Sequence, residues 1–248
     1  MRNRLDKLLF EQGLAPSRER AQALILAGRV LVDEQKVEKP GASFEDTAVL
    51  RVLGEEQRYV SRGGLKLEAA LKRWEIDLTG RYCADIGTST GGFTDCMLQH
   101  GAAGVAAVDT GYGQIAETLR RDPRVTLLER TNARYLKPGD LPSGISFVSM
   151  DVSFISATLV LPAVIAAVGS GSTLEGVILV KPQFEAGREH VGKGGIVHDP
   201  AAQQFAIDRV RTALHDLGAK ASELADSPIL GGGEGGKGNR EFLLYARF

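Results

Sequence analysis

The stretch DIGTSTGGFT, residues 85–94, decides the fold of this 248-residue chain. It comes directly after Tyr82–Ile86, an apolar segment with the composition of a strand. Glycine has no Cβ, so a glycine-rich turn can bend sharply and let a ligand approach the backbone closely. The helix expected after the turn begins with free amide groups. The stretch therefore predicts a strand, a tight turn and a helix, with a ligand-binding site at the turn.

The turn suits an adenosine-containing cofactor without phosphates. It has neither the Gly-x-x-x-x-Gly-Lys spacing of a phosphate loop nor a complete Gly-x-Gly-x-x-Gly motif, because Ser89 stands at the second glycine. We expect S-adenosylmethionine as the cofactor. A purely structural turn is the alternative, and a Phe that opens a helix is more often a core residue. The turn contributes these candidate cofactor-binding residues: Asp85, Gly87, Ser89, Thr90, Gly91, Gly92 and Phe93.

Asp109 supports the same cofactor. It ends the next expected strand, about twenty residues beyond the turn, where Rossmann-like folds place a carboxylate that accepts hydrogen bonds from ribose hydroxyls. The alternative is an aspartate that only caps the following helix. The sequence shows no set of residues suited to hydride transfer, so NAD is disfavoured.

Apolar strands alternate with helical segments from Tyr82 onward, which predicts an α/β fold with a doubly wound parallel sheet. The last two strands are too close in sequence for a long crossover and are expected to form an antiparallel edge. Gly169–Ser172 and Gly231–Asn239 are expected to be flexible loops, the second a mobile flap over the active site. The expected strands are Tyr82–Ile86, Val105–Val108, Val125–Leu128, Ile145–Met150, Val177–Val180, Lys220–Leu224 and Phe242–Ala246.

The first residues of the chain form a small α+β unit of their own. The spacing of Leu5, Leu8 and Leu9 predicts a first helix. Ser17 is placed to cap a second helix, and Gly28 is placed to end it. Short strands are expected to follow at Val30–Val32 and Ala48–Leu53.

Charge is distributed unevenly along the chain. The formal net charge is −1, so nucleic-acid binding would have to depend on local patches. Residues 1–32 carry about +3, residues 33–57 about −4 and residues 58–73 about +4. Solvated helix faces would explain this pattern equally well. The candidate RNA-binding residues are Arg4, Arg18, Arg20 and Arg62.

Other protein classes are disfavoured by composition. Two cysteines, Cys83 and Cys96, make neither a disulfide framework nor a metal cluster, and the four histidines do not gather at ligand spacing. The longest apolar run, Leu159–Val168, is about half the length of a membrane span. The charged N-terminus does not resemble a signal peptide. We therefore expect a cytoplasmic protein that uses no metal and does not bind membranes.

Four charged residues distant in sequence are the candidate catalytic group. Asp151 and Lys181 end the fourth and fifth expected strands, at the edge where open α/β sheets bind ligands. Lys66 precedes the first strand of this sheet, and Glu241 begins the last. A buried lysine requires a paired acid, so the four are expected to be partners. Four unrelated surface charges are the alternative.

Residues 1–57 resemble the S4-type RNA-binding module. The motifs that carry the resemblance are Arg4–Asp6 (RLD), Ser17–Ala21 (SRERA), Gly28 and Val30–Val32. In that family the paired helices present arginine and lysine to RNA phosphates. The resemblance therefore implies RNA binding by this part of the chain.

The remainder resembles the heat-shock-type (FtsJ-like) ribose 2′-O-methyltransferases. With the S4-type module and Tyr59–Gly64 (YVSRGG), it is similar to the TlyA group of bacterial ribosomal RNA cytidine 2′-O-methyltransferases. The motifs are Asp85–Thr94, Met150–Phe154, Val180–Glu185 and Gly238–Phe242.

That resemblance implies a Rossmann-like class I methyltransferase sheet, S-adenosylmethionine as cofactor, and ribosomal RNA or ribosomal subunits as partner, with no obligate protein partner. It implies three regions: an S4-type domain at 1–57, a linker and junction helix at 58–81, and a methyltransferase domain at 82–248. The family's Lys-Asp-Lys-Glu tetrad at the target ribose corresponds to Lys66, Asp151, Lys181 and Glu241. Asn132 corresponds to a residue near the adenine.

Ribose methylation needs in-line alignment and the loss of one proton. In one hypothesis Lys181 accepts that proton, because burial and the nearby Lys66 favour its neutral form. In the other, Lys181 only orients the hydroxyl and the proton passes to water. Asp151 and Glu241 would hold the two lysines in place. The alternative functions are a non-catalytic ribosome assembly factor and, less favoured, a haemolysin.

Overall fold

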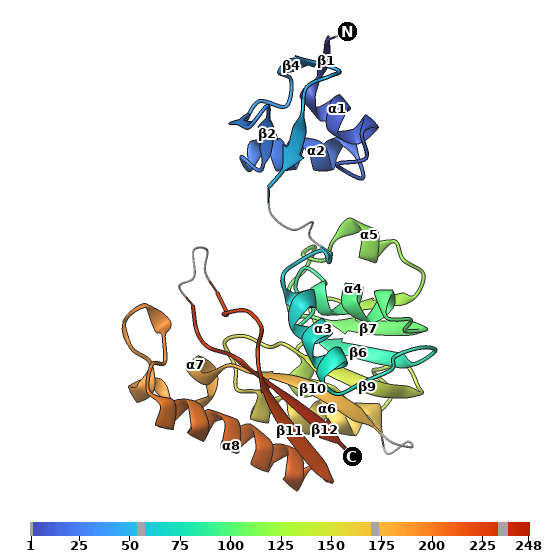
Figure 1. The fold of residues 1–248 in the computed structure, drawn as a ribbon. Coiled ribbons are helices and arrows are strands. Elements are labelled where there is room, and N and C mark those ends of the chain that lie inside the picture. The colour runs from blue at the N-terminus through green and yellow to red at the C-terminus, as the bar shows by residue number, and fades with distance from the viewer. Residues whose placement is uncertain (1, 54–57, 170–173, 233–237) are drawn as a thin grey trace. The chain divides into compact units, whose positions relative to one another are not determined.

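The computed structural model describes residues 2–53, 58–169, 174–232 and 238–248. The chain forms two compact units, Met1–Glu56 and Gln57–Phe248 (Figure 1). Residues 58–81, expected to be a junction, lie within the second unit and supply its first helix, α3 (Gly63–Arg73). Most of the two predicted loops, Gly169–Ser172 and Gly231–Asn239, lies outside the described residues.

The first unit contains the predicted helix pair and two small sheets. Ser17 caps the second helix as expected, because its Oγ accepts a hydrogen bond of 3.1 Å from the Arg20 N–H. Gly28 follows that helix with a φ of +64°, a conformation that suits glycine. The sheets, β1-β4 and β3-β2-β5, include strands that the sequence did not predict. The elements are β1 (Arg2–Arg4), α1 (Leu5–Glu11), α2 (Arg18–Leu26), β2 (Val30–Val32), β3 (Gln35–Lys36), β4 (Ser43–Glu45) and β5 (Leu50–Val52).

The second unit is built on a seven-stranded sheet with the order β11-β12-β10-β9-β6-β7-β8. The five strands from β10 to β8 are parallel, and β12 runs antiparallel to β10 and β11. The predicted antiparallel pair is confirmed, but β12 lies inside the sheet and β11 forms the edge. The strands are β6 (Tyr82–Ile86), β7 (Gly104–Val108), β8 (Val125–Leu128), β9 (Ile145–Met150), β10 (Glu175–Val180), β11 (Ala221–Asp226) and β12 (Phe242–Arg247).

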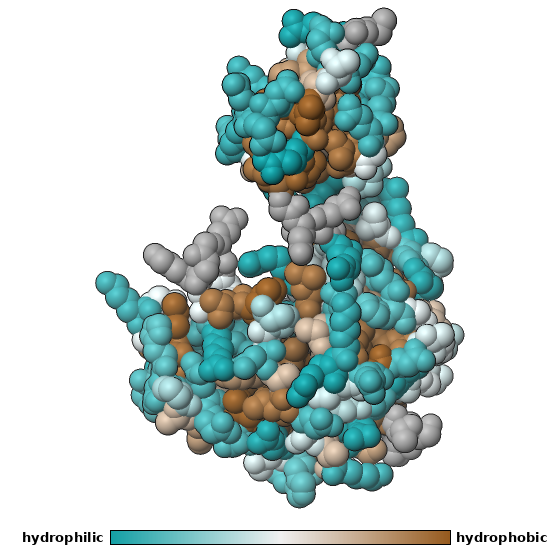
Figure 2. All heavy atoms as spheres, viewed as in Figure 1, coloured by the Kyte–Doolittle hydropathy of each residue, from teal (hydrophilic) through white to brown (hydrophobic). Residues whose placement is uncertain are grey.

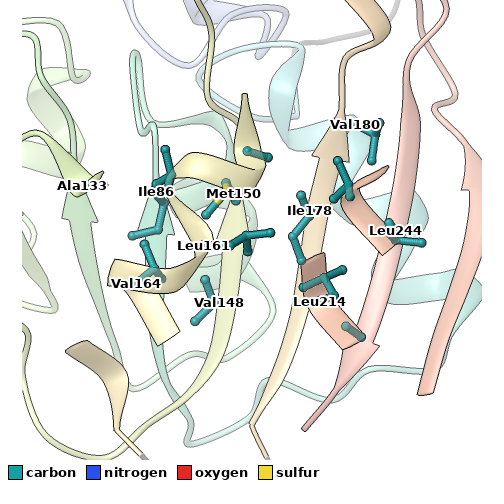
Figure 3. Close-up of a cluster of buried hydrophobic side chains, with 14 of the residues drawn as sticks. Ile86, Ala133, Val148, Met150, Leu161, Val164, Ile178, Val180, Leu214 and Leu244 are labelled. Atoms are coloured by element: carbon teal, nitrogen blue, oxygen red, sulfur yellow. The ribbon is translucent and has the colours of Figure 1, made fainter. Parts of the chain in front are cut away.

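Helices cover both faces of this sheet. Side chains of α6 and α8, such as Val164 and Leu214, pack with Ile86, Met150 and Ile178 of the strands (Figure 3). Helices α3 and α4 pack on the other face. The remaining elements are α4 (Gly92–Gln99), α5 (Glu117–Arg120), α6 (Leu161–Val168), α7 (Pro182–Glu185), α8 (Pro200–Asp216) and the 3₁₀ turns η1 (Ala133–Tyr135), η2 (Ala157–Leu159), η3 (Arg188–His190) and η4 (Lys193–Gly195).

One face of the second unit is mainly polar. On the face drawn in Figure 2, hydrophilic residues predominate there, with smaller hydrophobic areas between them. Within the described ranges, no helix has the length and apolar character needed to cross a bilayer.

The strand order predicts a ligand site at the carboxyl ends of the parallel strands, the edge of the sheet where these strands end. The chain runs outward through β6, β7 and β8 on one side and starts again at β9 beside β6. Such a reversal opens a crevice at the carboxyl ends of the strands, and open α/β sheets bind ligands there. The active site is therefore expected at the loops after β6, β9 and β10.

Candidate active site

Three of the four candidate catalytic residues reach one edge of the sheet through the ends of its strands. Asp151 directly follows β9 and Lys181 directly follows β10. Glu241 directly precedes β12, whose antiparallel register pairs Phe242 with Val180, the last residue of β10. The start of β12 therefore lies beside the end of β10. Glu241 reaches the same edge because of this reversed strand.

The four residues form two ion pairs. The Lys181 Nζ lies 2.5 Å from the Asp151 Oδ1 and donates a 2.7 Å hydrogen bond to the Ser153 Oγ. The Lys66 Nζ, from the first turns of α3, donates a 2.6 Å hydrogen bond to the Glu241 Oε2. Both lysines are less than 10% exposed, and Glu241 is 3% exposed. Each buried ammonium thus has a carboxylate partner, as burial of a charge requires.

A polar cavity of about 340 Å³, here the lysine cavity, lies at this edge. Lys66, Asp151 and Lys181 line it, and Glu241 stands behind Lys66. Arg62, which is exposed, lies on its wall at the start of α3. The further lining residues are Ser61, Gly63, Gly87, Thr88, Ser89, Thr90, Gly92, Phe93, Ser153, Ile229, Leu230 and Gly232.

A second cavity of about 390 Å³, here the Asp109 cavity, adjoins the first. The two share Gly87, Ser89, Asp151 and Ser153 as lining residues. The further lining residues of the Asp109 cavity are Ile86, Val108, Asp109, Thr110, Gly111, Gln114, Thr131, Asn132, Ala133, Val152, Phe154, Ile155 and Val160. This mixture of apolar and polar groups is typical of a small-molecule site.

The glycine-rich turn is shaped as a cradle between the two cavities. Gly87 has a φ of +86°, and a Cβ on it would lie 2.4 Å from the Asp151 carbonyl oxygen. Ser89 also has a left-handed φ of +51°, and its N–H donates a 2.7 Å hydrogen bond to the Asp109 Oδ2. The Gly111 N–H donates to the Asp109 Oδ1 at 2.7 Å. Asp109 is therefore fixed as an acceptor on the cavity wall, which fits a ribose of an adenosine cofactor.

The structure distributes the other predicted cofactor residues between the cavities. Thr90, Gly92 and Phe93 line the lysine cavity, although Phe93 is also part of the core. Asn132 lines the Asp109 cavity, and its Oδ1 accepts a 3.1 Å hydrogen bond from the Arg134 N–H. Gly91, with a φ of +96°, is not on either wall and instead makes the turn into α4.

Asp85 also lies outside both walls. Its side chain is fully buried, with Oδ2 accepting a 2.6 Å hydrogen bond from the Thr94 Oγ1 and Oδ1 accepting one of 3.3 Å from the Ser149 Oγ. Burial raises the pKa of Asp85 to about 7. Asp85 therefore links β6 to α4 and β9 from within the protein interior. It supports the glycine-rich turn but does not line either cavity.

The stability of the second unit should depend on the protonation of Asp85. Because its folded-state pKa is raised above the ordinary value, the folded state holds the proton more tightly, and this contribution is lost as the pH rises through about 7. The free energy of unfolding of the wild type, relative to Asp85→Asn, should therefore fall as the pH is raised from about 5 to about 8. Denaturation at each pH, followed by the fluorescence of Trp74, the single tryptophan, measures the free energy of unfolding of both proteins. A difference that stays constant over this range would contradict the assignment. Asp226→Asn, which removes an exposed carboxylate, is the matched control.

Sequence reasoning missed two residues of the loop after β9. Ser153 accepts the hydrogen bond from Lys181. Phe154 has a left-handed φ of +65° and is 92% exposed at the Asp109 cavity, with its ring 5.5 Å from that of Phe184. Both lie in the motif Met150–Phe154. Their position just after an expected strand, at its carboxyl end, could have indicated that they face the site.

Glu185 ties this loop to the one that carries Lys181. The buried Glu185 carboxylate, at the end of α7, accepts hydrogen bonds of 2.5 Å from the Ser156 Oγ and 2.6 Å from the Ala157 N–H. Helix α7 begins directly after Lys181, and η2 begins six residues after Asp151. The two segments that carry the Lys181–Asp151 pair are therefore fixed to each other.

The candidate RNA-binding arginines fall in both units. Arg62 lies on the wall of the lysine cavity. Arg4, Arg18 and Arg20 belong to the first unit, with Arg4 and Arg18 about half exposed and Arg20 partly buried. In the ranges that the structure describes, no group of three His, Cys, Asp or Glu is placed to hold a metal ion.

Comparison with known proteins is decisive for the family. A family model described as FtsJ-like methyltransferase matches residues 59–248, and one described as S4 domain matches residues 3–43. The chain belongs to the FtsJ-like methyltransferase family. FtsJ-like methyltransferases use S-adenosylmethionine, so the predicted fold class, enzyme class and cofactor are confirmed.

Relatives of this FtsJ-like methyltransferase extend over nearly its whole length. It is 44% identical to the 16S/23S rRNA (cytidine-2′-O)-methyltransferase TlyA of Mycobacterium tuberculosis, covering 99% of this chain and 90% of the relative. It is 40% identical to Hemolysin A of Brachyspira hyodysenteriae, covering 98% of each. A solved Streptococcus thermophilus structure, of a protein named as a hemolysin, is 43% identical with a TM-score of 0.72, covering 99% of this chain and 88% of that one.

Proposed function

We propose that this protein transfers a methyl group from S-adenosylmethionine to the ribose 2′-hydroxyl of a cytidine in ribosomal RNA. One observation carries the proposal: two buried lysines, each paired with a carboxylate, stand at a polar cavity that shares a wall with the candidate cofactor cavity. The name of the Mycobacterium tuberculosis relative, at 44% identity, supports cytidine and ribosomal RNA as the substrate.

The Asp109 cavity would hold the adenosine part of the cofactor. Asp109 would accept hydrogen bonds from the ribose hydroxyls, and Asn132 would lie near the adenine. Gly87 and Ser89, common to both cavities, would adjoin the reacting end. When bound, S-adenosylmethionine supplies an electrophilic methyl group.

Lys181 would orient the attacking 2′-oxygen. An ammonium has three N–H donors. The Lys181 Nζ donates one of them to Ser153 and forms an ion pair with Asp151, so an N–H remains available to the 2′-oxygen in the lysine cavity. A hydrogen bond to one lone pair leaves the other directed at the methyl group, and the hydroxyl proton passes to water. Of the two hypotheses from the sequence, the contacts of Lys181 favour orientation over proton acceptance.

The remaining residues would hold the nucleotide. The Lys66–Glu241 pair fixes a second ammonium on the wall of the same cavity. The exposed ring of Phe154 offers a stacking surface for a base turned out of an RNA structure. Arg62, on the wall of the cavity, would contact a phosphate of the same strand.

The S4-type unit would supply RNA affinity without taking part in the reaction. We assign residues 1–57 to this task, with Arg4, Arg18 and Arg20 as phosphate contacts, and residues from 58 onward to the methyl-transfer unit, which begins with the junction helix. Phosphate contacts position an RNA without reading its sequence, so the ribosomal subunit or its RNA is the expected partner. We place the reaction in the cytoplasm, where ribosomal subunits are found.

Methyl-label transfer to purified subunits tests the proposal. Labelled S-adenosylmethionine is incubated with the protein and with small or large ribosomal subunits that lack the modification. We expect label in the RNA of at least one subunit, and primer extension at low nucleotide concentration should stop at one cytidine in it. Absence of label in both subunits, with cofactor binding intact, would support a non-catalytic assembly factor instead.

A further inference from the structure

The first unit contains a buried carboxylate that binds two of the candidate RNA-binding arginines. Asp6, in the first turn of α1, has a side chain with 0% exposure. Its oxygens accept hydrogen bonds of 3.0 Å from both the Nε and the Nη2 of Arg4, and of 3.2 Å from the Nη2 of Arg18. Gln22 donates a further hydrogen bond of 2.7 Å.

The charge of Asp6 is strongly stabilised by this environment. The Arg4 guanidinium, with help from Gln22 and Arg18, holds the pKa of the Asp6 carboxyl well below its usual range despite burial. Arg4 precedes α1, whereas Arg18 and Gln22 lie one turn apart on α2. One carboxylate therefore fixes the chain before α1 against the start of α2.

The two arginines keep capacity for a ligand. Each guanidinium has five N–H donors, and Asp6 engages two of those of Arg4 and one of those of Arg18. About half of each arginine side chain is exposed. Both Nη2 atoms lie within 3.2 Å of the same Asp6 oxygen, so the guanidinium groups are neighbours. Two adjacent guanidinium groups suit an RNA phosphate, which has several acceptor oxygens.

Without a shared carboxylate, such a pair would be unfavourable. Two like charges repel at short range, and each free arginine loses side-chain entropy when it is fixed in one geometry. We propose that Asp6 is a positioning residue that holds Arg4 and Arg18 as one preformed phosphate-binding pair on the S4-type unit. The proposal rests on the proposed function, because it takes RNA as the ligand.

Asp6→Asn separates positioning from simple electrostatics. The substitution raises the charge of the unit by one, which by itself would strengthen binding to a polyanion. If Asp6 positions the arginines, binding should instead weaken roughly tenfold, and the slope of log affinity against log salt should decrease by about 1. Filter binding of the full chain to protein-free ribosomal RNA, over a series of salt concentrations, measures both quantities.

Glu34→Gln is the matched control. It removes a carboxylate from the same unit, where Glu34 pairs with Arg51 at 2.5 Å and both side chains are more than half exposed. The charge change equals that of Asp6→Asn, but no candidate RNA-binding arginine loses its anchor. We expect RNA affinity equal to the wild type or slightly higher.

A second background tests whether Asp6→Asn merely unfolds the unit. In an Arg4→Gln, Arg18→Gln chain, a positioning residue has nothing left to position, so adding Asp6→Asn should leave RNA affinity unchanged or slightly higher, as with Glu34→Gln. A further loss in that background would show a general structural role and overturn the proposal. Affinity of Asp6→Asn equal to or above the wild type would also overturn it. A wild type that binds RNA but never methylates it would contradict the proposed function alone.

Discussion

Replacement of Lys181 by alanine should reduce the rate of methyl transfer by about 10²-fold or more, because the attacking oxygen loses its alignment. The Lys181 Nζ forms an ion pair with Asp151, donates a hydrogen bond to Ser153 and keeps an N–H for the attacking oxygen. It does not line the Asp109 cavity, so affinity for the cofactor should remain nearly unchanged. Single-turnover transfer to ribosomal subunits, together with calorimetric binding of S-adenosylhomocysteine, separates the two effects.

Lys220→Ala is the control for this experiment. Lys220 is exposed and precedes β11, and it bonds through its backbone to Arg247 at the far end of β12. That position lies at the ends of the strands opposite to those that carry the active site. The control should therefore transfer methyl groups at the wild-type rate. Turnover by Lys181→Ala within about tenfold of the wild type would remove Lys181 from the mechanism in both of its proposed roles.

Glu241→Ala should destabilise the second unit as well as inactivate it. The substitution leaves the Lys66 ammonium, which is about one-tenth exposed, without its carboxylate partner. Breaking a buried ion pair from one side costs about 3–5 kcal/mol, because an uncompensated charge remains. The free energy of unfolding, followed by Trp74 fluorescence in denaturant, should fall by this amount.

Two further variants distinguish stability from catalysis. The double variant Lys66→Met, Glu241→Leu removes both charges and fills similar volume, so its stability should recover while methyl transfer stays lost. Asp226→Ala breaks the neighbouring but exposed Arg240–Asp226 pair and should change stability little. If Glu241→Ala unfolds at the same denaturant concentration as the wild type, the Lys66–Glu241 ion pair does not stabilise the second unit.

Much of the fold was predictable because local patterns agree with the topology. The expected strands Tyr82–Ile86, Val125–Leu128 and Ile145–Met150 match β6, β8 and β9 residue for residue. Alternation with helices correctly predicted parallel pairing. The insertion of β12 between β10 and β11 was not predictable, since an antiparallel strand can sit at an edge or within a sheet with the same local pattern.

The charges of the site were easier to predict than their partners. Residues at the carboxyl ends of parallel strands must share one edge, which brings Asp151 and Lys181 together. That Lys66 pairs with Glu241 depends on the register of β12 and the packing of α3. Such long-range geometry leaves no local trace in the sequence.

Asp85 shows the limit of motif reasoning. An acidic residue at the end of a strand has the same sequence pattern whether it faces the ligand or the interior. Here Thr94 and Ser149, on neighbouring elements, turn its carboxylate inward. Likewise the motif Arg4–Asp6 suggested RNA contacts by Arg4, but only the folded helix pair brings Arg18 to the same carboxylate.

The position of the transferred methyl group is the most direct test of the whole account. Ribosomal RNA treated with the protein and S-adenosylmethionine is digested to nucleosides and analysed by mass spectrometry. If Lys181 directs a ribose oxygen, 2′-O-methylcytidine should increase with the wild type and not with Lys181→Ala. A methyl group found on a base, such as 5-methylcytidine, would contradict the proposal that the lysine cavity holds a ribose.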